Sequence, residues 1–308
     1  CMQTTKLELK KLVYLYLMNY SRSQPERAIL VVNSFVKDST DPNPLIRALA
    51  IRTMGCIRVQ SVFEYFTEPL AKCLKDRDPY VRKTAVLSVL KLYCMNPQMI
   101  ESQGFVATLR DMLCDDNQMV LSNVVAALQE MQHNGSAVWD LNEKTVRPLL
   151  TALDGANEWG KVYLLEAISE YVPRDPKEAE NICDRVANKM THNNPAVVLA
   201  AAKVVLAHLE QVNPQVAQVY CRRLSPPLVT LILGNSTKKE YEIQYISLRC
   251  VNLIVQKYPH LFAPQLRTFF CSYDEPIYIK LEKLSIMLLL VNESNVIDVL
   301  SELREYCL

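Results

Sequence analysis

The sequence predicts an all-α protein built as an α-solenoid, a curved superhelix in which pairs of helices stack one after another. Three observations favour this fold class. Half of the 308 residues are hydrophobic, only 6 are glycine, and a turn followed by an apolar helix recurs along the chain. Scarce glycine with abundant leucine, valine and alanine favours helices over strands. We therefore expect one solenoid domain over residues 1–308.

The recurring unit is an acidic turn, then an aliphatic residue, a basic residue and a long apolar helix. The clearest copies are Asp41–Arg47, Asp76–Arg82 and Asp274–Lys280. The marker position, aliphatic in all copies but one, falls at Leu9, Ile46, Val81, Val120, Gly160, Val197, Ile243 and Ile279. Successive markers lie 37, 35, 39, 40, 37, 46 and 36 residues apart. A period near 40 is typical of HEAT or armadillo-type helix pairs, so we expect about eight of them.

The interval of 46 residues is the longest of the series and requires an insertion. The polar string Asn235–Glu240 lies inside it. We expect this string to form a longer loop.

The turns carry the residues that start helices. Asn43, Asp78 and Asn194 are good N-caps, because their side-chain oxygens accept hydrogen bonds from free backbone N–H groups. A proline follows each of them, at the first helical position, where the missing N–H has no cost. Helices are therefore expected to begin directly after these three residues.

A basic residue near the start of each helix opposes the helix dipole and needs a compensating charge. In three copies an acidic residue lies six positions earlier, in the pairs Asp41 with Arg47, Asp76 with Arg82, and Asp274 with Lys280. We expect these residues to form a ladder of ion pairs along the stacked turns. The alternative is a set of independent surface charges, each of which contributes little.

Motifs for catalysis and for cofactor or metal binding are absent from the sequence. It contains no glycine-rich phosphate loop, no His-Glu-x-x-His pair and no Gly-x-Ser-x-Gly elbow. The 10 cysteines include no C-x-x-C pair, and none of the 4 histidines lies near a cysteine in the sequence. We expect no enzyme activity, no cofactor and no metal.

Composition also restricts the partners and the compartment. Lys and Arg number 34 and Asp and Glu 33. The chain therefore lacks the overall basic charge that is typical of nucleic-acid-binding proteins, and we expect no nucleic-acid partner. The cysteines are scattered through apolar segments, which favours reduced, buried thiols in a reducing compartment. The longest apolar runs, such as Leu12–Met18, are far shorter than the roughly 20 residues that span a bilayer.

One aromatic residue allows two interpretations. Trp159 precedes Gly160 and could anchor a partner protein. Because tryptophan is highly buried on average, we favour a position in the core.

Several stretches together resemble the beta-adaptins, the beta-type large subunits of heterotetrameric clathrin adaptor complexes. The resemblance extends in order over essentially the whole chain. It is carried by Leu7–Leu17, Asp41–Ala50, Arg52–Val59, Lys75–Ala85, Pro226–Leu231, Asn252–Lys257 and Pro276–Leu284.

The resemblance implies that the chain is part of an adaptor trunk. In the family, this trunk pairs with a second large subunit and cradles the medium and small subunits that recognise sorting signals. The expected role is therefore a scaffold in vesicle-mediated protein transport, in the cytoplasm and peripherally on Golgi or endosomal membranes or at clathrin-coated pits. The extreme N-terminus, the last trunk repeats, and the hinge and ear that recruit clathrin are expected to be missing.

The resemblance also implies a GTPase contact. Trunks of the Golgi-type adaptor bind a GTP-loaded Arf-family GTPase through an early helix, which here starts near Pro25. Ile29 and Val32 occupy the matching positions. Both lie partly off the apolar stripe formed by Ala28, Val31 and Phe35, which would leave them available to a partner, although both could equally be core residues.

The alternative function is a different helical-repeat scaffold, such as a nuclear-transport receptor or a phosphatase scaffold. Such a protein would share the repeat period but not the family-specific stretches. Binding to the other adaptor subunits separates the two hypotheses.

Overall fold

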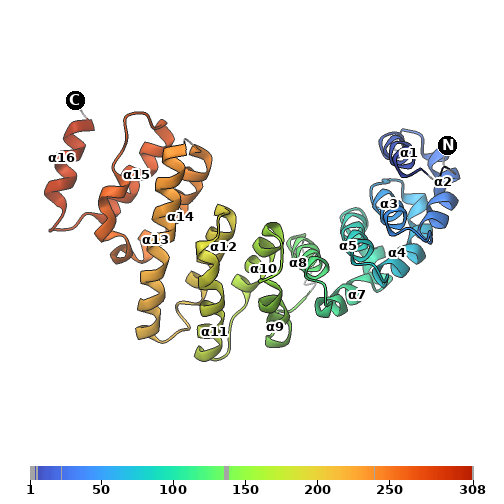
Figure 1. Ribbon diagram of the computed structural model, residues 1–308, viewed down its shortest axis with the longest axis horizontal. Coiled ribbons are helices and arrows are strands. Elements are labelled where there is room, and N and C mark those ends of the chain that lie inside the picture. Colours follow the sequence, from blue (N-terminus) through green and yellow to red (C-terminus); the bar gives the residue numbers. More distant parts are fainter. Residues whose placement is uncertain (1–3, 5, 22, 135–138, 239, 307–308) are drawn as a thin grey trace. The chain divides into compact units, whose positions relative to one another are not determined.

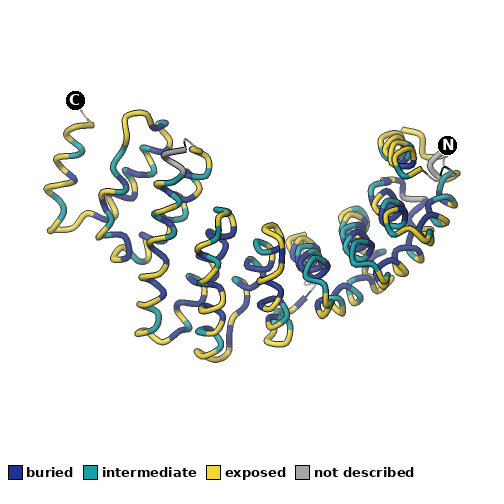
Figure 2. The backbone as a smooth tube through the Cα atoms, viewed as in Figure 1, coloured by how far each residue is buried: buried dark blue, intermediate teal, exposed yellow. Residues whose placement is uncertain are grey.

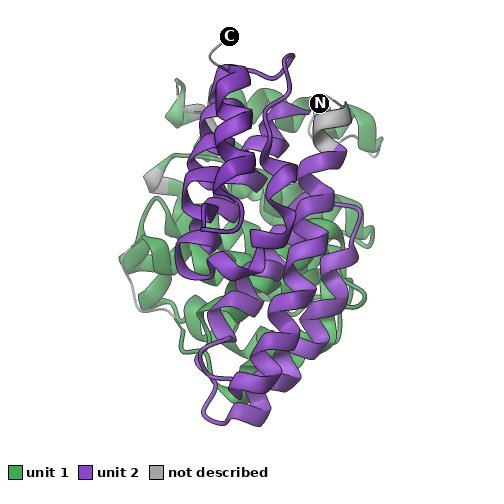
Figure 3. Ribbon diagram, turned by 90° about the vertical axis from the view of Figure 1, so that its left-hand side faces the viewer, with its two compact units in different colours: residues 1–171 green, residues 172–308 purple. Residues whose placement is uncertain are grey.

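The computed structural model describes residue 4 and residues 6–21, 23–134, 139–238 and 240–306. Within these ranges the chain consists of α-helices, short 3-10 helices and turns, with no strand (Figure 1). The helices form two compact units, residues 1–171 and residues 172–308 (Figure 3). The predicted all-α repeat architecture is confirmed within each unit.

Unit 1 contains ten α-helices and two 3-10 helices among its described residues. They are α1 Leu7–Tyr20, α2 Pro25–Asp38, α3 Pro44–Met54, η1 Gln60–Phe66, α4 Thr67–Leu74, α5 Pro79–Tyr93, α6 Pro97–Ser102, α7 Phe105–Asp111, η2 Met112–Cys114, α8 Gln118–His133, α9 Glu143–Ala152 and α10 Glu158–Glu170.

Unit 2 contains six α-helices and three 3-10 helices among its described residues. They are α11 Pro176–Ala187, η3 Asn188–Thr191, α12 Pro195–His208, α13 Pro214–Lys238, α14 Tyr241–Lys257, η4 Pro259–Leu261, η5 Ala263–Phe269, α15 Ile277–Leu290 and α16 Val296–Tyr306.

All eight marker residues occupy the same place in their helices. Each is the third residue of an α-helix, from Leu9 in α1 to Ile279 in α15. Six of them are buried, and only Ile243, which is half-buried, and Leu9, which is 50% exposed, are not. The repeat period therefore marks the start of one helix in every pair.

These marker-bearing helices form the packed row of unit 1. In chain order α3 packs against α5, α5 against α8, and α8 against α10. Val81, Ala85 and Val89 of α5 are fully buried, as expected for a helix covered by both neighbouring repeats. Figure 2 shows burial repeating from helix to helix within the unit.

The predicted helix starts are confirmed. Asn43, Asp78 and Asn194 each accept a hydrogen bond from the backbone N–H two residues later, at 2.9, 2.8 and 2.9 Å. A proline is the first residue of each helix that follows. The side chain satisfies one free N–H, and the proline removes another.

The predicted loop at Asn235–Glu240 is wrong. Helix α13 continues to Lys238 and is 25 residues long, although Pro226 and Pro227 lie inside it. Leu228 and Ile232 beyond the prolines are fully buried, and α13 packs against α14. This packing holds the helix together despite the two missing N–H groups, so the extra residues lengthen a helix. Residue 239 lies outside the described residues.

None of the helices within the described ranges combines the length and the apolar character that crossing a bilayer requires.

Candidate interaction surfaces

Arg47 connects two successive repeat turns of unit 1. It is the fourth residue of α3, and its guanidinium binds both carboxylate oxygens of Asp76, with Nε and NH2 each at 2.8 Å. Its NH1 donates to the backbone carbonyls of Asp41 and Pro42 at 2.8 and 3.0 Å. The side chain therefore ties its own turn to the turn of the next repeat.

Arg82, the fourth residue of α5, repeats this arrangement one helix pair later. It binds both carboxylate oxygens of Asp115 at 2.8 and 2.9 Å. Its NH1 donates to the carbonyls of Asp76 and Arg77 at 2.9 and 3.1 Å. The Arg47–Asp76 and Arg82–Asp115 pairs are called the turn ladder below.

The ladder thus exists in unit 1, but its predicted pairs are wrong. Arg47 does not pair with the Asp41 carboxylate, which folds back onto its own turn. Arg82 does not pair with the Asp76 carboxylate, which is bound by Arg47 and by its own turn. Asp41 accepts from the N–H of Asn43 at 2.8 Å, and Asp76 accepts from that of Asp78 at 2.9 Å. In each turn the aspartate supplies its backbone carbonyl to the arginine that follows it.

The third predicted pair is also wrong. Asp274 is exposed, and the ammonium of Lys280 donates to the carbonyl of Tyr273 at 3.0 Å. The buried charges at this turn are the next acidic residue, Glu275, and Lys283, whose Nζ lies 2.6 Å from Glu275 Oε1. The sequence alone did not reveal which of two adjacent carboxylates turns inward.

Two further contacts join the fourth residue of one marker helix to a carboxylate in, or directly before, the turn that leads to the next marker helix. In unit 1, Lys10 of α1 binds Asp38 at 2.7 Å, and Tyr14 also donates to this carboxylate. In unit 2, the Gln244 amide of α14 donates to Glu275 at 3.1 Å. The contacts of Lys10, Arg47, Arg82 and Gln244 share one sequence signal. The fourth residue of the marker helix is polar, and a carboxylate follows it 28 to 33 residues later.

The electrostatics around Asp76 favour its charged form. Burial alone would raise the pKa of Asp76, but hydrogen bonds from Arg47 and the N–H of Asp78 outweigh it and hold that pKa below its usual value. The same balance applies to Glu275, where Lys283, Ser272 and Gln244 lower the pKa against burial. Side-chain exposure is only 17% for Arg47 and 12% for Asp76, so solvent screens this pair weakly.

The two residues of the predicted GTPase contact differ in accessibility. Ile29 is 44% exposed on α2, whereas Val32 is only 4% exposed. The expectation that Val32 is available to a partner is therefore wrong, because its side chain lies on the same buried side as Phe35. The neighbouring Leu30 is 79% exposed, so α2 still presents an apolar surface. The side chain of Ala28 lies outside the described residues.

Trp159 is not the core residue that we predicted. It is 75% exposed in the first turn of α10. The next residue, Gly160, lies against α8, where an added Cβ would come within 3.0 Å of the side chain of Ser122. Because Gly160 faces the neighbouring helix, Trp159 points away from it. One turn later Tyr163 is also 41% exposed.

Unit 2 presents an apolar face on two adjacent helices. Helices α14 and α15 pack together and are linked by an ion pair between Arg249 and Glu282 at 3.0 Å. More than half of each of the following side chains is exposed: Ile246, Leu253, Ile277, Leu281 and Leu288. Exposed apolar side chains that gather on one face are typical of protein interfaces.

The side chains described so far form ion pairs, hydrogen bonds and apolar surfaces. The ladder residues bind one another, and the exposed residues on α2, α10, α14 and α15 are apolar or aromatic. No group of three or more His, Cys, Asp or Glu residues suited to a metal ion occurs among the described residues.

Helix pairs stacked at a regular period, with side chains linking consecutive turns, define the class of α-solenoid repeat scaffolds. The chain belongs to the family described as adaptin N terminal region, whose sequence model matches residues 1–307.

Individual relatives agree with this assignment. The chain is 52% identical over 310 residues to the AP-1 complex subunit beta-1 of Mus musculus, covering 99% of this chain and 32% of that protein. It is 51% identical over 308 residues to the AP-1 complex subunit beta of Dictyostelium discoideum, with the same coverage. The AP-2 complex subunit beta of Schizosaccharomyces pombe is 35% identical over 307 residues, 99% of this chain and 45% of that one. The chain thus spans less than half the length of these relatives.

Comparison with known structures supports the fold. A homology model of the full-length AP-3 complex in an intermediate open conformation matches with a TM-score of 0.67 at 19% identity, over 99% of this chain and 53% of that chain. A crystal structure of an engineered protein matches with a TM-score of 0.51 at 15% identity, over 94% of this chain and 76% of that one.

Proposed function

We propose that this chain is a trunk segment of a clathrin adaptor beta subunit and acts as a non-catalytic scaffold in vesicle-mediated protein transport. The observation that carries this proposal is the family match over residues 1–307, together with 52% identity to an AP-1 beta subunit. The alternative of a nuclear-transport receptor explains the repeat period but neither of these similarities.

The partners in this proposal are the second large subunit and the medium and small subunits of an adaptor complex. The apolar face on α14 and α15 is one surface of unit 2 suited to such a partner, since it exposes aliphatic side chains on both helices. The complex would bring the chain to Golgi or endosomal membranes or to clathrin-coated pits. Recruitment of clathrin would fall to other parts of the full-length subunit.

Co-expression with candidate adaptor subunits, followed by size-exclusion chromatography, tests the proposal. We expect a stable complex that contains the chain and at least the second large subunit. A chain that is well folded by circular dichroism yet elutes alone from every combination would contradict it. A nuclear-transport GTPase and an armadillo-binding cargo peptide serve as comparison partners for the alternative function.

An Arf-family GTPase in its GTP-bound form is the second proposed partner, and Ile29 is its candidate contact. The support is the exposure of Ile29 beside the exposed Leu30 on α2. Val32 is not part of this proposed contact, because its side chain is buried; its role in the proposal is to hold α2 in place.

Charge substitutions at these two residues distinguish surface from core. We expect Ile29→Asp to abolish GTPase binding in pull-downs and to leave the thermal melt unchanged. Val32→Asp buries an unpaired carboxylate and is expected to destabilise unit 1 by about 2–4 kcal/mol. Unchanged binding by the Ile29→Asp variant would reject the contact, and a normal melt for Val32→Asp would contradict its burial.

A further inference from the structure

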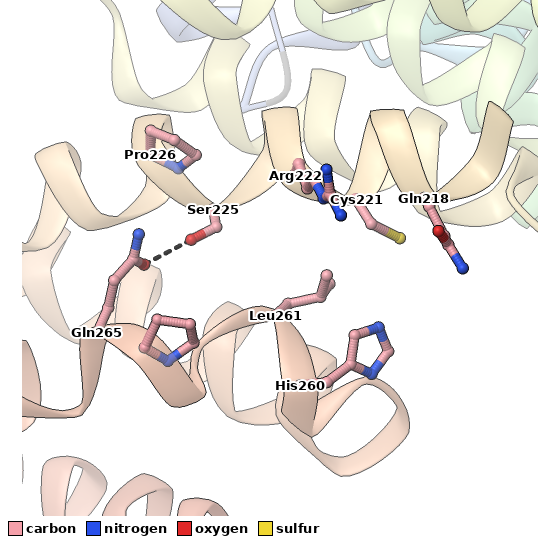
Figure 4. A pocket seen from close by; sticks show the side chains of 9 residues that line it. Gln218, Cys221, Arg222, Ser225, Pro226, His260, Leu261 and Gln265 are labelled. Carbon is pink, nitrogen blue, oxygen red and sulfur yellow. Dashed lines mark hydrogen bonds between the residues drawn. The ribbon is translucent and has the colours of Figure 1, made fainter. Parts of the chain in front are cut away.

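Unit 2 contains a cleft of mixed polar and apolar lining that the proposed scaffold role does not use. It has a volume of about 490 Å³ and lies between α13 and the η4–η5 segment (Figure 4). Helix α13 contributes Gln218, Cys221, Arg222, Ser225 and Pro226, and the opposite wall contributes His260, Leu261, Pro264 and Gln265.

The polar groups of this cleft include several hydrogen-bond donors. Arg222 supplies a permanent positive charge, and His260 faces α13 from the opposite wall (Figure 4). Ser225 donates to the Oε1 atom of Gln265, which fixes this amide and leaves its NH2 group for a ligand. None of the nine lining residues is an aspartate or glutamate. Such a lining favours an anion.

The apolar part of the lining favours an anionic group that is carried on a peptide. Pro226, Pro264 and Leu261 supply surfaces that suit a peptide backbone and small aliphatic side chains. Only two side chains of the lining, Arg222 and His260, can carry a positive charge, whereas binding to an anionic membrane surface generally uses clusters of about four to eight basic residues. A soluble peptide with one phosphate group fits this lining better than a lipid headgroup.

We propose that the cleft between α13 and the η4–η5 segment binds a phosphoserine- or phosphothreonine-containing peptide segment. Arg222 and His260 bind the phosphate from opposite walls. The Gln218 and Gln265 amides provide further donors, and the prolines contact the peptide beside the phosphorylated residue. The lining includes none of the residues in the proposed contacts on α2, α14 and α15.

Binding of defined probes to the chain tests this proposal. The probes are a capped phosphoserine–proline pentapeptide, its unphosphorylated counterpart, inorganic phosphate, and vesicles with and without a phosphoinositide. Calorimetry is expected to detect the phosphopeptide and, more weakly, phosphate, but not the unphosphorylated peptide. Equal binding of both peptides, or binding only to phosphoinositide vesicles, would overturn the proposal.

Matched variants assign the binding to this cleft. Arg222→Ala and His260→Ala are each expected to lower the affinity for the phosphopeptide by about tenfold, as for the loss of a charge-assisted hydrogen bond. Arg223→Ala is the control, because Arg223 is also exposed and adjacent but does not line the cleft. If Arg222→Ala and Arg223→Ala lowered the affinity for the phosphopeptide equally, the binding would be explained by general charge attraction, and the proposed site would be contradicted.

Nuclear magnetic resonance provides a readout of position that does not depend on affinity. The chain has only 4 histidines, so the ring protons of His260 can be assigned by their loss in His260→Ala. The phosphopeptide should shift the His260 signals and leave those of His133 unchanged, since His133 lies at the end of α8 in unit 1. Phosphopeptide binding without a shift at His260 would place the ligand elsewhere and refute the proposal.

Discussion

Arg47 makes four hydrogen bonds in two repeats. Two go to the Asp76 carboxylate of the next turn, and two go to backbone carbonyls of its own turn. The planar guanidinium can do this because its N–H groups point in fixed, divergent directions. A lysine at this position would supply the charge without the paired geometry.

Substitution of Asp76 measures the contribution of one ladder pair. Asp76→Asn removes the charge that Arg47 binds, and we expect the free energy of unfolding to fall by about 1.5–3 kcal/mol at pH 7. The control is Arg77→Ala, an exposed neighbour, which should change stability by less than about 0.5 kcal/mol. Urea melts provide the comparison, and equal effects of the two variants would contradict a structural role for the pair.

The same pair predicts a dependence on pH. Because folding lowers the pKa of Asp76, its contribution is complete above the unfolded value of about 3.9 and is lost as the pH falls through the lower folded value. The stability difference between wild type and Asp76→Asn should therefore persist at pH 5 and shrink below about pH 4. A difference that stayed constant down to pH 2 would assign the effect to packing.

At the scale of single residues, the sequence predicted roles better than partners. The capping roles of Asn43 and Asp78 followed from local chemistry, since an N-cap needs only its own next turn. The partner of Arg47 could not follow in this way, because it lies 29 residues away and is set by the stacking of two repeats. Trp159 and Val32 show the same limit, since burial depends on which side of a helix its neighbours cover.

At the scale of helices, glycine sets how closely two marker helices approach. A Cβ added at Gly55, which directly follows α3, would lie 2.8 Å from Ser88 Cβ and 3.0 Å from Ser88 Cα of α5. The Ser88 hydroxyl also donates to the carbonyl of Ile51 in α3 at 3.0 Å. The two helices could not accept a larger side chain here without separating.

A valine at this contact tests the approach of the helices. Gly55→Val is expected to destabilise unit 1 by about 1–3 kcal/mol, because the backbone of α5 has to move. Gly234→Ala is the matched control, since a Cβ there meets nothing within 4 Å and alanine favours the helix. Thermal melts of both variants check this, and a neutral Gly55→Val substitution would show that the contact tolerates a side chain.

Helix lengths were harder to predict than helix starts. All eight marker residues fall at the third position of a helix, but the end of α13 was misplaced. The start is encoded locally by caps and prolines. The end of α13 instead depends on buried Leu228 and Ile232, whose contacts the polar string after them did not reveal.

At the scale of the whole molecule, the repeat period gave the fold class and the number of marker helices. It did not predict that the helices form two compact units, residues 1–171 and 172–308. The division arises from contacts between helices, and a marker every 35 to 46 residues continues across it without change. Local sequence patterns record where repeats begin but not how strongly consecutive repeats pack.

Each unit has its own buried core and is expected to fold separately. Residues 1–171 and residues 172–308, expressed as two polypeptides, should each show helical circular dichroism and a cooperative melt, because solenoid stability comes from contacts between adjacent repeats. The full chain is the reference. If either of the two polypeptides is unfolded under conditions in which the full chain is folded, this expectation is contradicted.

The contacts between turns also affect how the chain tolerates insertions and deletions. Their two ends are separated by 28, 29, 33 and 31 residues, yet each contact joins the start of a marker helix to a carboxylate in, or directly before, the turn that precedes the next marker helix. The intervening segment contains the rest of the marker helix and then the second helix of the pair with its loops, and the contact does not fix the length of this second part. Residues can therefore be gained or lost there during evolution while the spacing between neighbouring marker helices stays the same.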